Sequence, residues 1–269
     1  MKEYLADTKK AFDSASVTFD EDDRGNAILQ WMRSQAYKVY LENFADGDKL
    51  LELNSGTGID AFYLASKGIG VYATDISTGM IGVIRQKLAA QNEASENLLG
   101  AEVLSFDDIS GVNFSGFDGV ISNFGGLNCI PDFTKLSHDL SLKLKPGGKF
   151  IAVVIGRLCP WETFFYSLKF QFKTAFRRFS KGGVDANLNG ETIRTFYFTP
   201  ARFAKDFEKE FTVEKIYSHG AFTPPPYLVN IYNQLRPVVK VLMKLDEITR
   251  EIFPFNRFGD HFIIVLRKT

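Results

Sequence analysis

The stretch Lys49-Leu50-Leu51-Glu52-Leu53-Asn54-Ser55-Gly56-Thr57-Gly58 decides the fold, and Asp75 follows 17 residues after Gly58. Its first half is apolar apart from Glu52, which is typical of a buried strand, and its second half consists of small residues that favour a tight turn. Glycines let the backbone approach a ligand, and a helix that begins at Ile59 would offer it free N–H groups. With a second strand that ends at Asp75, this unit is typical of proteins that hold an adenosine-containing cofactor.

Strand and helix patterns alternate along the first part of the chain. We expect strands at residues 50–53, 71–74, 101–105, 119–122 and 150–155, and helices at 26–44, 59–67, 78–91 and 132–144. Such alternation requires right-handed crossovers and predicts an α/β fold with a parallel sheet that is covered on both faces. We divide the chain into an N-terminal helical closure (1–45), a Rossmann-like cofactor-binding core (46–156), and cap insertions that carry the last two strands (157–269).

Composition excludes several classes of protein. Among the 269 residues, 32 Lys and Arg balance 32 Asp and Glu, so the overall charge gives no argument for a nucleic-acid partner. The two cysteines, Cys129 and Cys159, are too few for a disulfide framework and fit a reducing compartment. The N-terminus is polar, unlike a signal peptide, and no stretch is apolar enough to span a bilayer. We therefore expect a cytoplasmic protein.

The turn differs from a dinucleotide-binding Gly-x-Gly-x-x-Gly turn. Asn54 stands at its first glycine position, its third glycine is absent, and Asp60 would repel a pyrophosphate. Glu52 instead suits a cofactor with a cationic amino-acid end. Asp75 could accept both ribose hydroxyls, although it could also cap the helix that follows. Phe106, Asp107 and Asp108 could meet an adenine or form a solvated turn.

Five motifs occur in order along residues 10–155, and together they resemble those of the class I S-adenosylmethionine-dependent methyltransferases. They are Leu51–Gly58, Ala73–Ser77, Phe106–Asp108, Phe117–Asn123 and Leu144–Gly148. The resemblance implies a doubly wound, seven-stranded, mostly parallel sheet whose last strand is antiparallel, and Phe262–Leu266 is a candidate for that strand. It also implies S-adenosylmethionine as cofactor and S-adenosylhomocysteine as product.

The resemblance assigns roles by position. Glu52 and the Asn54–Gly58 backbone would hold the methionine portion, and Asp75 the ribose. The residues implied at the cofactor are Phe19, Glu52, Asn54, Ser55, Gly56, Thr57, Gly58, Asp75, Ile76, Met80, Phe106, Asp107, Asp108, Asn123 and Phe124. Phe12 and Phe19 stand where related enzymes often have tyrosines that close over the cofactor. Phe19 lacks the hydroxyl, and Asn54 replaces the usual glycine.

The segment from Trp161 to Gly183 has an aromatic stripe at helical spacing, formed by Phe164, Leu168, Phe172, Phe176 and Phe179. Its only charges after Glu162 are basic. Three interpretations fit this pattern: a surface helix packed on the sheet, a lid over the substrate, or a helix lying in a membrane surface. We favour the first and keep a membrane partner open. A basic aromatic lid would suit an anionic amphiphile.

In-line methyl transfer requires positioning of the acceptor and exclusion of water, and an oxygen or carbon acceptor also needs a base. Candidates are Glu162, Tyr197, Tyr227, His219 and His261, each of which can equally be structural. We see no metal-ligand cluster and no nucleophile elbow. The predicted function is methyl transfer to a small-molecule or lipid-like acceptor. The alternatives are an NAD-dependent oxidoreductase and a non-catalytic cofactor-binding protein of the same fold.

Overall fold

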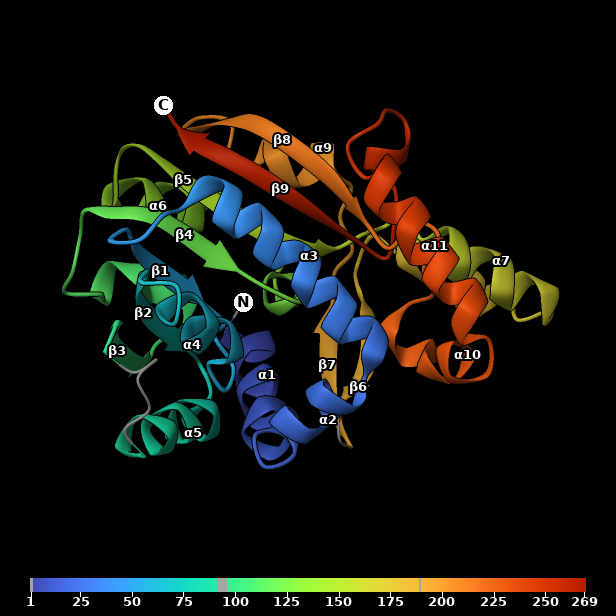
Figure 1. Cartoon of the computed structure of the whole chain (residues 1–269), viewed down its shortest axis with the longest axis horizontal. Coiled ribbons are helices and arrows are strands. Elements are labelled where there is room, and N and C mark those ends of the chain that lie inside the picture. The colour runs from blue at the N-terminus through green and yellow to red at the C-terminus, as the bar shows by residue number, and fades with distance from the viewer. Residues whose placement is uncertain (1, 91–95, 189) are drawn as a thin grey trace.

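A seven-stranded sheet forms the centre of the molecule (Figure 1). The computed structural model describes residues 2–90, 96–188 and 190–269. In spatial order the strands are β3 (Leu98–Val103), β2 (Gly70–Asp75), β1 (Lys49–Leu53), β4 (Phe117–Ser122), β5 (Leu144–Ile155), β9 (His261–Lys268) and β8 (Phe211–His219). Neighbouring strands from β3 to β5 are parallel, whereas β9 runs antiparallel to both β5 and β8. The predicted sheet with an antiparallel last strand is confirmed.

Helices cover both faces of this sheet, and each face has its own core. On one face, α3 (Ala27–Asn43), α4 (Ile59–Ala65) and α5 (Thr78–Ala89) pack on strand residues such as Leu50 and Ile151. On the other, α6 (Thr134–Lys143) and the segment around α9 (Pro200–Lys205) pack on strand residues such as Leu51 and Phe150. Successive strand residues therefore enter opposite cores, as the period of two requires. Helix α6 ends at Lys143 and β5 begins at Leu144, so this strand starts earlier than the strand expected at residues 150–155.

The N-terminal segment forms two further helices, α1 (Lys2–Ala15) and α2 (Phe19–Gly25), before α3. Asn26 caps α3, since its side-chain oxygen accepts from the Ile28 and Leu29 N–H groups. Asp13 on α1 accepts from the Ser77 hydroxyl at 2.6 Å and from the Gly79 N–H at 2.9 Å. Helix α1 thus caps the start of α5, and these hydrogen bonds fix α1 against the carboxyl edge of the sheet.

The cap differs from the predicted continuous helix. It consists of α7 (Pro160–Leu168), α8 (Phe172–Ala175) and η4 (Arg177–Phe179), and Phe170 has a φ of +56° in the break between α7 and α8. After this segment, β6 (Val184–Leu188) and β7 (Glu191–Thr195) form an antiparallel hairpin.

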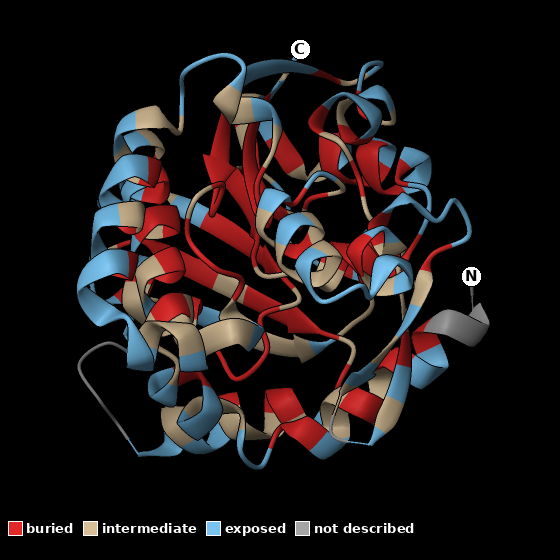
Figure 2. Ribbon diagram, turned by 90° about the vertical axis from the view of Figure 1, so that its right-hand side faces the viewer, coloured by how far each residue is buried: buried red, intermediate tan, exposed pale blue. Residues whose placement is uncertain are grey.

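The rest of the cap comes from η5 (Pro226–Leu228), α10 (Val229–Gln234), α11 (Arg236–Thr249) and η6 (Phe255–Arg257). Helices α7, α10 and α11 lie together at one end of the molecule, and Figure 2 looks onto that end. Among the helices described, none combines the length and apolarity that crossing a bilayer requires.

Candidate active site

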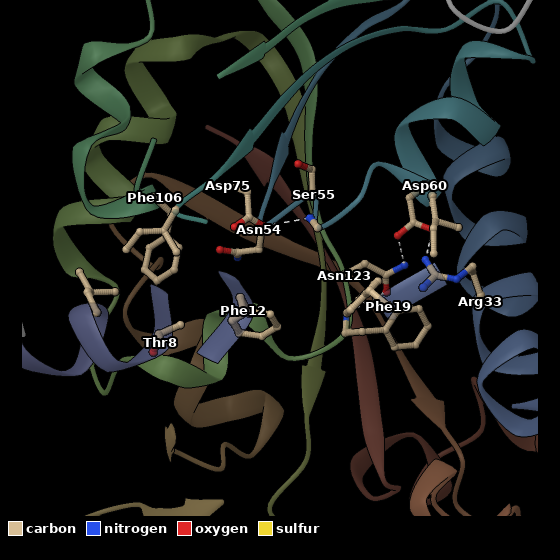
Figure 3. Close-up of a pocket in the computed structure, with 16 residues that line it drawn as sticks. Thr8, Phe12, Phe19, Arg33, Asn54, Ser55, Asp60, Asp75, Phe106 and Asn123 are labelled. Carbon is tan, nitrogen blue, oxygen red and sulfur yellow. Dashed lines mark hydrogen bonds and ion pairs between the residues drawn. The ribbon is translucent and has the colours of Figure 1, made fainter. Parts of the chain in front are cut away.

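A cavity of about 650 Å³ opens where β1, β2 and β4 end (Figure 3). The segments that follow these strands supply Asn54–Gly56, Ile76 and Asn123–Phe124, with Asp75 as the last residue of β2. Its remaining walls come from Leu5, Thr8, Phe12, Phe19, Arg33, Ile59, Asp60, Phe106 and Gly126. In open α/β sheets, ligands bind at this edge. Parts of α1, α2 and α3 close the cavity from outside the sheet.

Asn54 fits the turn despite standing at a glycine position of the related motif. Its φ of +54° lies in the left-handed region, which asparagine tolerates better than most residues. Its amide donates to the Ser122 hydroxyl at 3.2 Å. An added Cβ at Gly126 would lie only 2.5 Å from the Asn54 side chain. The space for this asparagine therefore depends on the glycine after β4.

Asp75 closes the turn from the neighbouring strand. Its carboxylate accepts from the Gly56 N–H at 2.9 Å and from the Ser77 N–H at 2.8 Å, one oxygen for each. Burial raises the pKa of Asp75 to about 6 against these hydrogen bonds. The helix-cap alternative does not hold, because the Ser77 hydroxyl caps α5 by accepting from the Met80 N–H. Each carboxylate oxygen retains accepting capacity for a ligand hydroxyl.

Glu52 is buried in β1 just behind the turn, with 1% of its surface exposed. Its Oε2 atom has no hydrogen-bond partner among the described residues. Burial raises the pKa of Glu52 well above its ordinary value, and the nearby charge of Asp60 adds to this effect. The side chain does not form part of the cavity wall. An unpaired buried carboxyl of this kind is costly unless a donor or a cation satisfies it.

A buried charge network borders the cavity beside Glu52. Arg33 on α3 pairs with Asp60 and, at 2.6 Å, with Asp23 on α2. Asp60 also accepts from the Tyr37 hydroxyl at 2.8 Å and from the Asn123 amide at 2.7 Å. One cation is thus shared by two carboxylates. Sequence reasoning missed Arg33, and the only available signal was a cation amid the apolar positions of the predicted helix.

Nine of the fifteen residues predicted at the cofactor line the cavity. They are Phe19, Asn54, Ser55, Gly56, Asp75, Ile76, Phe106, Asn123 and Phe124. Phe12 also lies on the wall, opposite the turn (Figure 3). Phe124 has a φ of +44° in the loop after β4, and the Arg33 guanidinium lies 4.8 Å from its ring centroid.

The other six predicted residues lie outside the wall for identifiable reasons. Glu52 lies behind the turn, as described above. Thr57 donates its hydroxyl to Asp20. Gly58 has a φ of +80°, and a Cβ added there would lie 2.9 Å from Ile84. Met80 is buried at the start of α5. Asp107 and Asp108 lie in η2 (Phe106–Gly111), where Asp108 is exposed. These residues shape or flank the site in the ligand-free chain.

The five catalytic candidates also come together, in a second cluster next to the cavity. Glu162 accepts from the Tyr227 hydroxyl at 2.6 Å and is paired with both Arg177 and Arg178. Burial acts to raise the pKa of Glu162, but the two arginines outweigh it and hold that pKa below its ordinary value. The Arg178 guanidinium lies 5.2 Å from the Tyr197 ring centroid. Glu162 is therefore a fully paired carboxylate, which makes it a weak base.

The two histidines lie on the side of this cluster that faces the cavity. Asp260 accepts from Arg178 at 2.6 Å and lies 2.9 Å from His261 Nδ1. Burial acts to raise the pKa of Asp260, but Arg178 and His261 outweigh it and lower that pKa. An ionised Asp260 places the proton of the neutral imidazole on Nδ1, so that Nε2 can accept. The rings of His261 and His219 lie 6.0 and 6.3 Å from that of Phe124, a wall residue.

His219 differs from His261 in its surroundings. It is buried, its Nε2 has no partner among the described residues, and burial lowers its pKa to about 3. It is therefore a neutral imidazole at physiological pH. Within the described ranges, no group of His, Cys, Asp or Glu side chains has the arrangement of a metal site.

Comparison with known proteins identifies the core. Residues 51–150 match the family model described as a methyltransferase domain. The demethylmenaquinone methyltransferase of Clavibacter sepedonicus is 33% identical over 153 residues, which cover 54% of this chain and 60% of that protein. Residues 51–150 therefore form a methyltransferase domain. The sequence match thus spans less than two thirds of this curated relative, and it is confined to about half of the chain.

Solved methyltransferases share the fold over a longer stretch. A structure described as a putative S-adenosylmethionine-dependent methyltransferase from Listeria monocytogenes has a TM-score of 0.60 at 17% identity, covering 88% of this chain and 97% of its own. The 1,6-didemethyltoxoflavin-N1-methyltransferase of Burkholderia thailandensis has a TM-score of 0.58 at 17% identity, covering 100% and 90%. At these identities the similarity concerns the fold alone, and in the Burkholderia structure it covers the whole of this chain, the cap included.

Proposed function

We propose that this chain transfers a methyl group from S-adenosylmethionine to a small-molecule or lipid-like acceptor. The observation that carries the proposal is the group of carboxyl side chains in and just behind one end of the cavity wall. Glu52 lies unpaired behind the turn, and Arg33 is shared by Asp23 and Asp60. This end therefore has an excess of carboxyl groups, which suits a ligand with a cationic amino-acid portion and disfavours a pyrophosphate.

The remaining walls fit the other parts of the cofactor. Asp75 can accept the two ribose hydroxyls through oxygens that the backbone already orients. Phe106 and Ile76 offer an apolar seat for the adenine next to it. S-adenosylmethionine bound in this way would supply an electrophilic methyl carbon on a positive sulfur. Asn123 and Phe124, after β4, would then border the methyl group, where they exclude water and orient the acceptor.

His261 is the residue best placed to take a proton from an acceptor. Its Nδ1 is held by Asp260, and its ring packs edge-on against Phe124. This geometry fixes the tautomer and leaves Nε2 as the basic atom, as in other carboxylate-oriented histidines. Glu162 and Tyr227 instead bind each other, and we assign them to holding the cap together.

Two relatives are named for small-molecule acceptors, demethylmenaquinone and 1,6-didemethyltoxoflavin, which supports an acceptor of that size for this chain. Calorimetry with S-adenosylhomocysteine and NADH side by side separates the proposal from an oxidoreductase. We expect binding of the former alone, and tighter binding of NADH would overturn the proposal.

Turnover separates an enzyme from a non-catalytic cofactor-binding protein. Methyl-labelled S-adenosylmethionine would be incubated with small-metabolite and lipid extracts in the presence of wild type or Asp75→Asn protein. We expect label to enter an acceptor with the wild type only. If the protein binds the cofactor but no fraction of either extract accepts the labelled methyl group, the non-catalytic alternative would be favoured.

A further inference from the structure

The cap exposes an unusual amount of apolar surface. Every exposed phenylalanine of the described residues lies between residues 164 and 253. The first stripe, predicted to pack on the sheet, is solvent-facing instead: Phe164 and Leu168 are 65% and 64% exposed, and Phe170 reaches 82%. A second stripe follows α10, α11 and the turn after it. We call the two stripes together the cap patch: Phe164, Leu168, Phe170, Phe172, Phe176, Phe179, Leu235, Val238, Val241, Leu245, Ile248, Ile252 and Phe253.

Both stripes belong to one end of the molecule (Figures 1 and 2). Tyr227, which precedes α10, donates to Glu162 on α7, and the Arg177 guanidinium lies 5.7 Å from the Tyr227 ring centroid. The two parts of the cap are therefore fastened to each other. A shallow depression beside α7 is lined by Phe164, Phe179 and Phe258. Many exposed apolar side chains gathered at one end of a protein favour an interaction site over ordinary surface.

Basic residues outnumber acids in the cap patch, and its exposed acid Glu251 lies within ion-pair distance of Lys215 and Arg250. Glu162 is the only acid from residue 160 to 181, and it is buried and paired with two arginines. On α11, Asp246 is buried and accepts three backbone N–H groups, and Glu247 is paired with Lys244. Across the described residues, no carboxylate pairs with the exposed cations that remain, which are Lys169, Lys173, Lys181, Arg236 and Lys240. The cap patch is thus basic in a chain whose overall charge is balanced.

Lysines and phenylalanines alternate closely along the first stripe. Lys169 and Lys173 flank Phe170 and Phe172, and the Lys169 Nζ atom lies 4.0 Å from the Phe165 ring centroid. The cores of protein–protein interfaces are depleted of lysine. A lipid headgroup layer instead accepts both residue types, since the aromatic rings enter the acyl boundary while the ammonium groups remain at the phosphates. We propose that the cap patch docks this protein onto the surface of an anionic lipid bilayer.

The position of the patch gives docking a consequence. Strands β4 and β5 run toward the cap, and the cavity opens at the ends of β1, β2 and β4. A bilayer under the cap would therefore lie at the same end of the molecule as the site. A lipid-like acceptor could then pass from the bilayer to the site without crossing water. Docking itself does not depend on the proposed methyl transfer, so the two can fail independently.

The test is flotation of the full chain with phosphatidylcholine vesicles, with and without phosphatidylglycerol. We expect binding to the anionic vesicles alone and its loss at high salt. Phe170→Ser/Phe172→Ser should weaken binding on the order of tenfold or more. Lys169→Glu/Lys173→Glu/Lys181→Glu should weaken it on the order of a hundredfold. Circular dichroism and thermal melting of each variant would check that the fold is intact.

Matched controls lie outside the patch. Leu142 on α6 is 65% exposed, and Lys205 and Lys209 are exposed near α9. Leu142→Ser and Lys205→Glu/Lys209→Glu should bind vesicles like the wild type. Phe172→Trp should also show fluorescence that brominated lipids quench, whereas Leu142→Trp should not.

Two results would overturn the proposal. The first is a failure of the vesicle experiment: either the wild type does not bind anionic vesicles, or the patch variants bind them as tightly as the wild type does. The other is a wild-type dimer in light scattering that becomes monomeric in Phe170→Ser/Phe172→Ser, because a second copy of the chain would then cover the patch.

Discussion

Glu52→Gln tests the charge argument at the cofactor site. In the ligand-free protein, burial and the charge of Asp60 raise the pKa of Glu52 well above its ordinary value. Glutamine therefore replaces a carboxyl whose protonated, neutral form is favoured by its surroundings, and it has nearly the same shape. We expect the free energy of unfolding without ligand to change by less than about 1 kcal/mol.

The effect on ligand binding should be larger. A ligand ammonium favours the ionised carboxylate, and a charge-assisted hydrogen bond contributes about 1.5–3 kcal/mol. Part of this free energy is offset by the cost of removing the proton from Glu52. We therefore expect Glu52→Gln to weaken ligand binding by about tenfold. Because the bound cation lowers the pKa of Glu52, binding should release protons, and affinity should rise with pH until the pKa of the free protein is passed.

The assay compares two ligands by calorimetry. S-adenosylhomocysteine carries the amino-acid end, whereas 5′-methylthioadenosine lacks it. Glu52→Gln should weaken the first and leave the second unchanged, and Asp75→Asn should weaken both because each ligand has a ribose. At a pH well above 6, where Asp75 is already ionised, buffers of different ionisation enthalpy would reveal the protons released by Glu52 in the wild type only. Equal loss of both ligands in Glu52→Gln, or no loss of either, would refute the assignment of the cationic end to Glu52.

Three further predictions concern the same site. Gly126→Ala should lower the free energy of unfolding by about 1–3 kcal/mol because the new Cβ would meet the Asn54 side chain. Adding Asn54→Gly to that variant should restore the free energy of unfolding, measured with urea. Affinity for 5′-methylthioadenosine should fall as the pH is lowered through about 6, where Asp75 gains its proton, and a flat profile between pH 5 and 8 on calorimetry would contradict this. Arg33→Gln leaves two buried carboxylates without their cation and should cost about 3–5 kcal/mol in thermal unfolding, whereas removing the exposed Lys209 should cost almost nothing.

The sheet could be predicted because its signals are local. Each strand is a short apolar run between turn residues, and each helix has its own periodicity, so the order of elements follows from reading the chain once. The family resemblance predicted Asn54, Asp75 and Asn123 at the cofactor, and all three line the cavity because parallel strands end at a common edge. Thr8 and Arg33 also line the cavity, but they come from helices whose packing depends on long-range contacts.

The aromatic stripe shows a second limit of pattern reading. Helical spacing predicted that Phe164, Leu168 and Phe172 share one face, but periodicity does not say whether another element covers that face. The helix breaks at Phe170, where φ is +56°, and Glu162 near the start of α7 pairs with Arg178 in η4. The chemistry of that pair was visible in the sequence, and its geometry was not.

The catalytic candidates converge because of the antiparallel last strand. Glu162 follows the end of β5, and His219 is the last residue of β8, so both lie at the carboxyl edge of the sheet. His261 is the first residue of β9 and would lie at the opposite edge if β9 were parallel. Because β9 runs antiparallel between β5 and β8, its first residue pairs with Ile155 and His219, the last residues of its neighbours. The inserted strand therefore delivers Asp260 and His261 to the edge at which the cofactor cavity opens.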